Sequence, residues 1–552
     1  MKRSLLFLAV VGVLVLSLTV LRLPMDAAEE HEHGHGTMEK GKLIKPNPAA
    51  IVVPKGYKVE LFASGLNTPA AAAVDKDGNV WVAESGSCCG PSAKQEGLAS
   101  QLKVFDKSGK LIKTIDESQF INNLLAVDYN PENGMIYAAD YTRMLEINPK
   151  DYSVKVIVKD LPMGDHVNDQ MAFKDGYLYW GQGFPSNTGF ADPDNHPGWA
   201  DTKDPFWGGQ TAHDPPCRDI VLAGLNVRSS DGRLTGAFLP AGTPSEPGQV
   251  VKARVPCGGS IMRAKLSDKG PDGIIPHDKM EVYAYGFRNP YGIAFAPDNH
   301  WLKGALFTSN NGPNDIGNRR VANGPETIYI VHQGMDYGFP DKFGFLDSTA
   351  KTFSLKAYPP GPIAREMAAW ENPFPNLYLG NKPYVPHVGV HGTNITGQGG
   401  VRGVPRLIAN PNEVIGNPIA EFDPNISVNG MEFSKSEKFG MVGDLFAAII
   451  GHFGVAPEGL EHKGHNVVRL QFLQPTGVVI TEFARNKKPG PSSEQAPEDQ
   501  GGLERPNDVT FDPSGETMYI VDYGQMTLQW DTPSPLYTAP GSGNVWKVTR
   551  AQ

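Results

Sequence analysis

The sequence predicts an all-β fold, a six-bladed β-propeller with long loop insertions between some of its strands. Three observations favour this fold: hairpin-like segments recur six times, turn-forming residues are abundant, and sustained helical periodicity is weak. Glycine (62) and proline (47) together make up about a fifth of the 552 residues, well above average usage. So many turn residues indicate short strands joined by many loops.

Each repeated segment has an apolar pair, a turn, and then alternating strand residues. An Asp-Gly or Pro-Asp type of tip supplies the tight turn, and the alternation allows one face to be buried. The six segments, of which the fifth is the weakest match, lie at residues 73–84, 127–140, 172–180, 293–308, 431–447 and 509–522. Six hairpins in one chain are typical of radial repetition, which predicts about six blades.

Two long gaps interrupt the hairpin pattern, at residues 186–256 and 340–430. Both are rich in Gly, Pro, Asp and Asn, which favours long inter-strand loops on one face of the ring. Small independent domains are the alternative, although neither gap shows a sustained hydrophobic period. We therefore expect residues 55–552 to form a single propeller domain.

The N-terminus indicates export. A positive start, Met1 to Arg3, precedes an apolar run over residues 5–21, so residues 1–28 read as a signal peptide or an N-terminal membrane anchor. Residues 29–54 read as a flexible linker, and the histidine tract at 31–35 is either solvated or a weak metal binder. We expect an extracytoplasmic location: secreted, periplasmic or anchored outside the cytoplasm.

The four cysteines of an exported chain predict disulfides. Cys217 and Cys257 bracket a loop-rich stretch and form the natural pair. Cys88 and Cys89 are adjacent, so they form either a strained vicinal disulfide or two thiols. The spacing matches neither a haem attachment motif nor a paired zinc motif.

Composition and charge exclude several partners. A hydrophobic share of 40% and a charged share of 20% exclude wholesale disorder and a protein with many membrane spans. The formal net charge of −10 argues against a nucleic-acid surface. The expected partner is a small, neutral molecule.

Three clusters carry residue types suited to chemistry. His166 lies between carboxylates in 164–169 and is a candidate general base, or else a turn residue. Arg288 and Asn289 lie between Gly and Pro and suit an anionic, carbonyl-rich ligand, or else tie blades together. Residues 309–315 offer carbonyl and side-chain oxygens to a hard cation, or else form an ordinary turn.

Several motifs resemble one known family. They are residues 286–292 (GFRNPYG), 311–314 (NGPN) and 336–340 (DYGFP), with support from 257–263 (CGGSIMR), 56–66 and 505–509 (RPNDV). In this order and spacing they resemble the glucose/sorbosone dehydrogenase family, soluble six-bladed quinoprotein propellers that use pyrroloquinoline quinone (PQQ) with calcium. The likeness spans roughly residues 55 to 550. Within the family, the sequence is similar to the sorbosone-dehydrogenase-like branch.

The resemblance implies roles for individual residues. His166 would be the general base, and Arg288 and Asn289 would contact PQQ, with Arg288 also stabilising charge on the reduced quinone. Asn311 and Gly312 would belong to the same cofactor site. Gly312 and Pro313 would supply carbonyl oxygens to the calcium. The implied activity is oxidation of a sugar, sugar aldehyde or polyol by hydride transfer to PQQ, with an external electron acceptor.

The sequence also departs from the family pattern. Residues 121–126 (INNLLA) replace a Gln-Gly-Gly-Leu-Leu-Gly stretch, and 451–455 (GHFGV) replace a turn that precedes a basic residue. His452, Lys463 or Arg469 are candidate substitutes for that basic residue. These departures leave a second reading: a non-redox propeller, either a calcium-dependent lactone hydrolase or a binding module that has lost PQQ.

Overall fold

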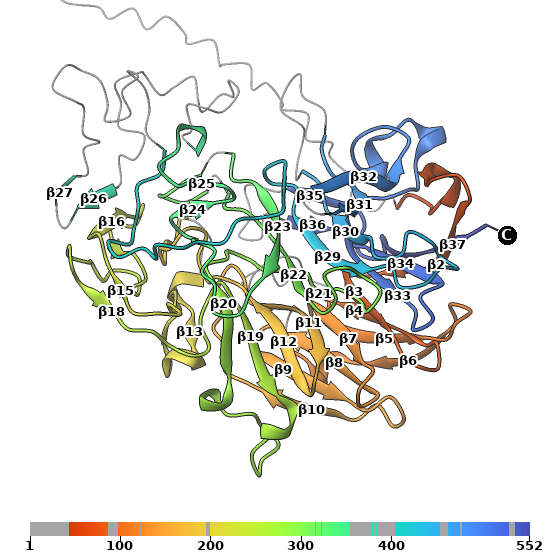
Figure 1. Cartoon of the computed structure of the whole chain (residues 1–552), viewed down its shortest axis with the longest axis horizontal. Coiled ribbons are helices and arrows are strands. Elements are labelled where there is room, and N and C mark those ends of the chain that lie inside the picture. Colours follow the sequence, from red (N-terminus) through yellow and green to blue (C-terminus); the bar gives the residue numbers. More distant parts are fainter. Residues whose placement is uncertain are drawn as a thin grey trace, which may run out of the picture.

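Six four-stranded or five-stranded antiparallel sheets form a ring in the computed structural model (Figure 1). The structure describes residues 43–86, 98–121, 123–194, 199–314, 316–321, 323–353, 377–379, 382–383, 403–452, 462–474, 477–528 and 536–551. The predicted signal or anchor segment, the histidine tract and the Cys88–Cys89 pair lie outside these residues.

The first three blades follow one another along the chain. The first contains β3 (Pro69–Val74), β4 (Val80–Glu84), β5 (Gln101–Phe105) and β6 (Leu111–Ile115). The second contains β7 (Ala126–Asn130), β8 (Met135–Asp140), β9 (Arg143–Ile147) and β10 (Val154–Val158). The third contains β11 (Asn168–Lys174), β12 (Tyr177–Gln182), β19 (Ser260–Lys265) and β20 (Glu281–Tyr285).

Of the other three blades, the fifth and sixth each include a strand from the N-terminal end of the described chain. The fourth contains β21 (Ile293–Phe295), β22 (Leu306–Asn310), β23 (Glu326–Val331) and β28 (Ala420–Phe422). The fifth contains β29 (Val428–Phe433), β30 (Leu445–Ile449), β31 (Asn466–Leu473), β32 (Gly477–Asn486) and β1 (Ile51–Val52). The sixth contains β33 (Pro506–Phe511), β34 (Thr517–Asp522), β37 (Gly543–Arg550) and β2 (Tyr57–Leu66).

The six predicted hairpins are the two inner strands of the six blades, so the predicted all-β propeller is confirmed. The first hairpin shows why the sequence folds this way: the Asp75 carboxylate accepts hydrogen bonds from the backbone N–H groups of Asp77 and Asn79, both at 2.9 Å. The same carboxylate accepts from the Trp81 indole at 3.0 Å, which links the turn to the core. The helical elements among the described residues are short 3₁₀ turns.

The innermost strands of neighbouring blades contact one another around the whole ring. Apolar clusters fill the spaces between blades; one of them joins Trp546 and Val548 of the sixth blade to Phe446 and Phe483 of the fifth. The outer strand β2 pairs with β37 from Tyr57↔Arg550 to Leu66↔Gly543, so a strand from the N-terminal side completes the last blade.

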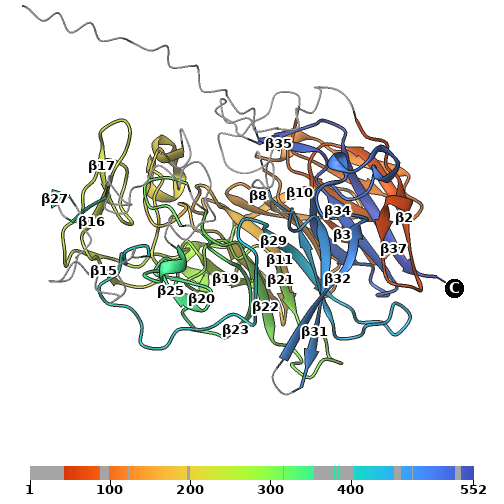
Figure 2. The same ribbon diagram turned by 90° about the horizontal axis from the view of Figure 1, so that it is seen from above.

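Both long gaps in the hairpin pattern carry short paired strands. The first holds β13 (Lys203–Asp204), β14 (Gln210–Thr211), β15 (Ile220–Val221), β16 (Leu225–Arg228), β17 (Leu234–Gly236) and β18 (Val250–Val251). The second holds β24 (Lys342–Phe343), β25 (Leu346–Asp347), β26 (Leu377–Leu379) and β27 (Lys382–Pro383). Because β16 pairs with both β17 and β26, the two insertions share a sheet. They lie together to one side of the ring (Figures 1 and 2).

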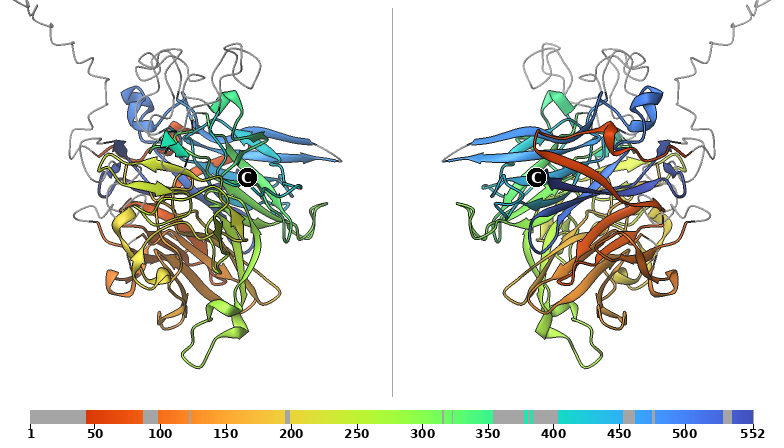
Figure 3. Two further views of the ribbon diagram at one scale, coloured as in Figure 1. Left: turned by 90° about the vertical axis from the view of Figure 1, so that its left-hand side faces the viewer. Right: turned by 90° about the vertical axis from the view of Figure 1, so that its right-hand side faces the viewer.

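Two further pairs complete the description. β35 (Met526–Leu528) and β36 (Leu536–Thr538) form a small antiparallel pair in the connection between β34 and β37 of the sixth blade. β31 and β32 project beyond the other strands as a two-stranded ribbon, which is plain in side view (Figure 3).

Within the described part of the chain, no helix has the length and apolar character needed to cross a membrane.

The predicted pairing of Cys217 with Cys257 is confirmed. Their sulfur atoms form a disulfide, with Cα atoms 5.1 Å apart. The bond ties the first insertion to the chain just before β19. It therefore anchors the insertion to the third blade.

Candidate functional site

The candidate residues lie at one end of the ring. Antiparallel inner hairpins bring the start of each innermost strand next to the end of the second strand. His166 precedes β11, Arg288 and Asn289 precede β21, and Asn311, Gly312 and Pro313 follow β22. An antiparallel bridge between Asn289 and Asn311 extends the β21–β22 pair toward this end.

A glycine allows His166 and Asn289 to approach each other. Gly183 lies between them: a Cβ added there would be 2.3 Å from the Cβ of His166 and 2.8 Å from Oδ1 of Asn289. A methyl group does not fit in that space. The third and fourth blades therefore bring the candidate base and the candidate amide together only because residue 183 has no side chain.

The imidazole of His166 is held by its Nδ1 atom. Nδ1 lies 3.0 Å from the carbonyl oxygen of Phe184 and 3.7 Å from Oδ2 of Asp165. A carbonyl only accepts, so the contact with Phe184 places the proton on Nδ1 and the lone pair on Nε2. This tautomer suits a general base that acts through Nε2.

Arg288 is a fully buried guanidinium, 2% exposed. Its Nε donates to the carbonyl of Asn187 at 3.1 Å, its Nη2 donates to Oδ1 of Asn187 at 2.9 Å, and Nη2 lies 3.5 Å from Oδ2 of Asp165. Burial lowers the pKa of Arg288, while the nearby carboxylates of Asp165 and Glu326 oppose that shift. The result is a fixed cation close to His166, because both groups contact Asp165.

Asn187 was missed by sequence reasoning. Its Oδ1 accepts from Arg288 and from the N–H of Asn314 at 3.0 Å, and its Nδ2 donates to the carbonyls of Asn314 at 2.9 Å and Ile316 at 3.1 Å. One amide thus joins the loop after β12 to the loop after β22. The residue lies in an unremarkable stretch at the start of the first insertion, so no local signal identified it.

The side-chain amides next to Arg288 are linked to one another by hydrogen bonds. Asn289 Nδ2 donates to Asn311 Oδ1 at 2.8 Å, and Asn311 Nδ2 donates to Asn429 Oδ1 at 3.0 Å. The backbone N–H groups of Arg288 and Asn289 both donate to Asn310 Oδ1. The buried Oδ1 of Asn289 accepts no hydrogen bond within the described residues, so it offers an acceptor to a ligand.

Gly312 and Pro313 present backbone oxygens. Neither carbonyl accepts a hydrogen bond in the part of the chain that the structure describes. The Pro313 oxygen lies against Gly324, where an added Cβ would be 2.5 Å away. The N–H of Gly312 donates to Oε2 of Glu326 at 3.0 Å, and burial raises the pKa of that carboxyl to about 7.

These groups fit both implied cofactors in the chemistry of their donors. Carbonyl oxygens that accept no hydrogen bond are ligands that calcium takes. A buried guanidinium and an unpartnered amide oxygen suit an anionic ligand rich in carbonyls. The site therefore fits the kind of ligand that the sequence motifs imply.

Two of the residues proposed to replace the family's basic residue in the fifth blade, Arg469 and His452, lie toward opposite ends of the ring. Arg469 forms an ion pair with Asp444, which precedes β30 and thus lies toward the opposite end of the ring. His452 lies at the candidate end, where its carbonyl accepts from Arg505 at 2.5 Å. Arg505 is 3% exposed, and burial lowers its pKa to about 10. Sequence reasoning had noted Arg505 only as part of a closing motif; it is a second buried guanidinium at this end.

Comparisons with known proteins support the fold. No family model matches the chain. A 103-residue stretch is 29% identical to quinoprotein glucose dehydrogenase B of Acinetobacter calcoaceticus. This stretch covers 17% of this chain and 18% of that protein. The matched stretch is thus less than a fifth of that relative's length.

Two solved structures superpose on most of the chain. One is a calcium structure of the carbohydrate-active enzyme family AA12 from Trichoderma reesei, with TM-score 0.50, 13% identity, and coverage of 93% of this chain and 100% of that one. Another is the holo PQQ domain of pyranose dehydrogenase from Coprinopsis cinerea, with TM-score 0.49, 12% identity, and coverage of 92% and 98%. The chain is thus a six-bladed β-propeller whose motifs resemble those of the glucose/sorbosone dehydrogenase family.

Proposed function

We propose that the protein is an oxidoreductase that oxidises a sugar, sugar aldehyde or polyol by hydride transfer to PQQ, with calcium as the Lewis acid. The observation that carries the proposal is the proximity of three groups at one end of the ring. The Cβ of His166 and Oδ1 of Asn289 both lie beside Gly183, and the His166 imidazole and the Arg288 guanidinium both lie near the Asp165 carboxylate. A base can take the hydroxyl proton of an alcohol, and an amide and a fixed cation can orient the hydride acceptor and stabilise the charge that it gains.

His166 would take the proton. PQQ, when bound, would supply the acceptor for the hydride of the substrate's C–H bond, and calcium held by the carbonyls of Gly312 and Pro313 would supply a Lewis acid. The hydroxyl proton of the substrate passes to the Nε2 lone pair of His166, whose orientation is set by the Nδ1 contact with Phe184. Asp165, at 3.7 Å from Nδ1, stabilises the imidazolium that forms.

The other residues would bind and orient. Arg288 supplies a positive charge whose position is set by Asn187. Asn289, held by Asn311, presents Oδ1 to the ligand. The carbonyls of Gly312 and Pro313 would hold the calcium. Asn187 is a positioning residue here, since it acts through Arg288.

A second candidate function rests on the same geometry. The Nε and Nη2 atoms of Arg288 already donate hydrogen bonds to Asn187, so the protein itself satisfies much of the hydrogen-bonding capacity of the guanidinium. This favours a propeller that no longer needs PQQ and acts as a calcium-dependent lactone hydrolase or a binding module. The two candidates differ in one measurable property, which is binding of the quinone.

Reconstitution tests the proposal. Purified protein is titrated with PQQ in the presence and absence of calcium, with binding followed by absorbance and calorimetry, and dye reduction is then assayed with a panel of aldoses and polyols. We expect calcium-dependent PQQ binding and turnover. His166→Ala should lower kcat by about 10² or more while PQQ still binds.

His332→Ala is the matched control, because His332 is an exposed histidine away from the site. It should leave turnover unchanged. Absence of PQQ binding together with lactone hydrolysis would replace the first function with the second. Equal turnover in His166→Ala and the wild type would remove His166 from the role of base.

We also infer that the protein works outside the cytoplasm and passes electrons to a separate acceptor. The disulfide between Cys217 and Cys257 supports an oxidising compartment. Cell fractionation with an antibody against the full chain tests the location. Recovery of the protein with reduced Cys217 and Cys257 from the cytosolic fraction would contradict it.

A further inference from the structure

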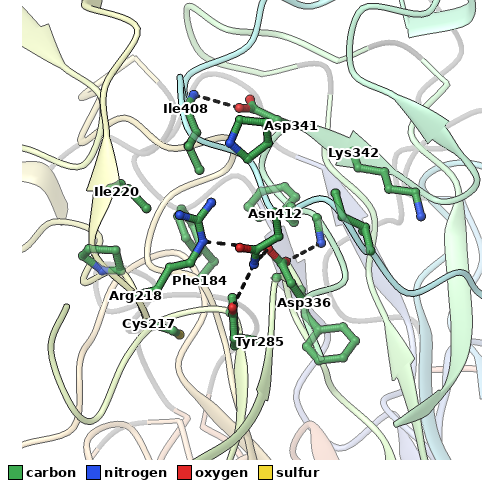
Figure 4. A pocket seen from close by; sticks show the side chains of 18 of the residues that line it. Phe184, Cys217, Arg218, Ile220, Tyr285, Asp336, Asp341, Lys342, Ile408 and Asn412 are labelled. Atoms are coloured by element: carbon green, nitrogen blue, oxygen red, sulfur yellow. Dashed lines mark hydrogen bonds and ion pairs between the residues drawn. The ribbon is translucent and has the colours of Figure 1, made fainter. Parts of the chain in front are cut away.

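A cavity lies beside the candidate site, between the third and fourth blades and the two insertions (Figure 4). Its volume is about 430 Å³, which is within the range of roughly 300–1,000 Å³ that small-molecule sites occupy. None of His166, Arg288, Asn289, Asn311, Gly312 or Pro313 lines it. The cavity is therefore separate from the site to which the proposed function belongs.

A row of hydrogen-bonded polar groups forms one wall of this cavity. Asn412 Nδ2 donates to the Tyr285 hydroxyl at 2.9 Å and to Oδ2 of Asp336 at 2.8 Å, and the Arg218 Nε lies 4.0 Å from the same Oδ2 (Figure 4). Arg218 is held by the carbonyls of Asp219 and Asn410. The row joins the first insertion, the end of β20 and the second insertion, so its geometry is set by several elements at once.

These groups keep unused hydrogen-bonding capacity. The Tyr285 hydroxyl accepts from Asn412 but donates to no residue that the structure describes. Burial raises the pKa of Tyr285, so the phenol keeps its proton and can donate it. Lys342 uses two of its N–H donors on Gly416 and Asn417, each at 2.7 Å, and has a third to offer.

Aromatic rings complete the cavity. Phe184 and Phe339 pack edge to face inside, with centroids 5.0 Å apart. Phe345 also lines the cavity and is 52% exposed, so its ring is accessible to a ligand. A ring beside hydrogen-bonding groups suits a ligand with one apolar face and several hydroxyls.

The charges of the lining do not favour an ion. Asp341 pairs with Arg319 and Asp347 pairs with Arg406, and Arg218 faces Asp336. Carboxylates thus neutralise the lining arginines from within the protein, and the Lys342 ammonium is accompanied in the lining by the Glu413 carboxylate. With acidic and basic side chains both present, the lining has no strong excess of one sign, which suits a neutral ligand that uses the remaining donors and acceptors.

We propose that this cavity is a second binding site, which takes a neutral saccharide: a mono- or disaccharide, either free or at the end of a longer glycan. The hydroxyls of the sugar bond to Tyr285, Asn412 and Lys342, and its apolar face lies on Phe345. The site holds the sugar without reacting with it. The inference does not depend on PQQ, because none of the residues assigned to PQQ, calcium or proton transfer lines the cavity; Phe184, whose carbonyl holds His166, contributes its ring to the cavity.

The test measures binding in the full chain without added PQQ or calcium. Calorimetry and ligand-observed NMR are run with neutral monosaccharides and disaccharides, with a hexuronate as the charged analogue, and with a soluble polysaccharide. We expect saturable binding of a neutral sugar with a Kd on the order of 1 mM. Binding of the free sugar identifies a small-molecule ligand, whereas binding of the polysaccharide alone identifies a glycan end.

Two variants locate the binding. Phe345→Ala changes an exposed ring and should weaken binding about tenfold; Tyr285→Phe removes one hydroxyl and should weaken it about threefold. Trp301→Ala, which changes another exposed ring outside the cavity, should have no effect. His166→Ala should also leave this binding intact.

Three results would overturn the inference: no neutral sugar binds, the hexuronate binds more tightly than its neutral parent, or binding survives both cavity variants. Loss of binding in His166→Ala, with Phe345→Ala unaffected, would place the sugar in the candidate redox site instead. Failure of PQQ reconstitution leaves this test unchanged, so the two proposals can fail separately.

Discussion

At the scale of single residues, Gly183 shows how little space the candidate site leaves. A Cβ at this position would lie 2.3 Å from the Cβ of His166 and 2.8 Å from Oδ1 of Asn289. Both neighbours belong to the set that the sequence singled out. Gly183 itself does not, because a glycine next to a strand end has no pattern that distinguishes it from the many turn glycines of this chain.

Gly183→Ala should therefore damage the site more than the fold. The added methyl must displace His166 or Asn289, and such overpacking destabilises proteins by about 1–3 kcal/mol. We expect turnover to fall by about 10² because the base is moved by a fraction of an ångström or more. Steady-state kinetics and urea unfolding measure the two effects.

The control is Gly477→Ala, where an added Cβ has no neighbour nearer than 3.5 Å. It should leave both turnover and unfolding unchanged. Equal activity of Gly183→Ala and the wild type would show that residue 183 does not limit the position of His166.

Asp214 carries a pH prediction. The side chain is fully buried and accepts from the N–H of Ser186 at 2.8 Å and from its hydroxyl at 2.7 Å. Burial raises its pKa from 3.8 to about 7. The folded state thus binds this proton more tightly than the unfolded state, so stability falls as pH rises from about 4 to about 7 and is level above that range.

Asp214→Asn should remove this slope. The amide keeps the shape and can accept from the N–H and donate to the hydroxyl of Ser186, but it does not ionise. The wild type should lose stability relative to the variant by up to about 1.4 kcal/mol per pH unit between pH 4 and 7. Urea unfolding at pH 4.5, 6 and 8 measures the difference.

Asp298→Asn, at a carboxylate 89% exposed, is the matched control and should unfold in parallel with the wild type. If Asp214→Asn also unfolds in parallel at all three pH values, the Asp214 carboxyl has no raised pKa.

At the scale of elements, a buried arginine holds the two insertions against the ring. Arg319 donates to the carbonyls of Thr188, Pro340 and Pro405 and pairs with Asp341 at 3.1 Å. Asp341 in turn accepts from the N–H groups of Leu407 and Ile408. These bonds connect chain segments more than two hundred residues apart, from residue 188 to residue 405 and beyond.

Arg319→Met should be strongly destabilising. It leaves the Asp341 carboxylate buried without its cation and three carbonyls without donors, a loss of about 3–5 kcal/mol. Chemical unfolding followed by fluorescence measures it, and Arg319→Met with Asp341→Asn should recover part of the loss. Lys303→Met, which breaks an exposed pair with Asp298, should cost less than about 1 kcal/mol. Similar effects of Arg319→Met and Lys303→Met would contradict the structural role.

Prediction from sequence was strong for the elements and weak for contacts between them. The tips at Asp77–Gly78 and Asp175–Gly176 marked hairpins because turn chemistry and alternation are local. The pairing of Cys217 with Cys257 followed from compartment and spacing. The short strands of the insertions were not predicted. One of them, β16, pairs with β26 across a long stretch of chain, and neighbouring residues do not encode such a contact.

At the scale of the whole molecule, the ring depends on its closing strand. β2 supplies the outer strand of the sixth blade and pairs with β37 along its length. Without it, β37 would expose its backbone groups and the blade would lose one side of its core. Closure also brings the N-terminal end of the described chain against its C-terminal end.

Truncation tests this closure. A chain of residues 43–552 keeps every described strand and should unfold cooperatively near the wild-type midpoint. A chain of residues 67–552 lacks β1 and β2 and should show no cooperative transition, or one at much lower urea concentration. Circular dichroism and urea unfolding distinguish the two, and equal midpoints would show that the ring closes without β2.

The sequence by itself determined the all-β class, the number of blades, one disulfide, and the residues at the loops where the site lies. These features depend on turn residues and alternation, which neighbouring amino acids encode. Only the tertiary structure showed that the absence of a side chain at Gly183 lets His166 and Asn289 approach each other. It also showed that Asn187 fixes Arg288, and that Arg218, Tyr285 and Asn412 line one cavity. Such contacts join residues far apart in the chain, and their geometry exists only after the ring has closed and the blades have packed.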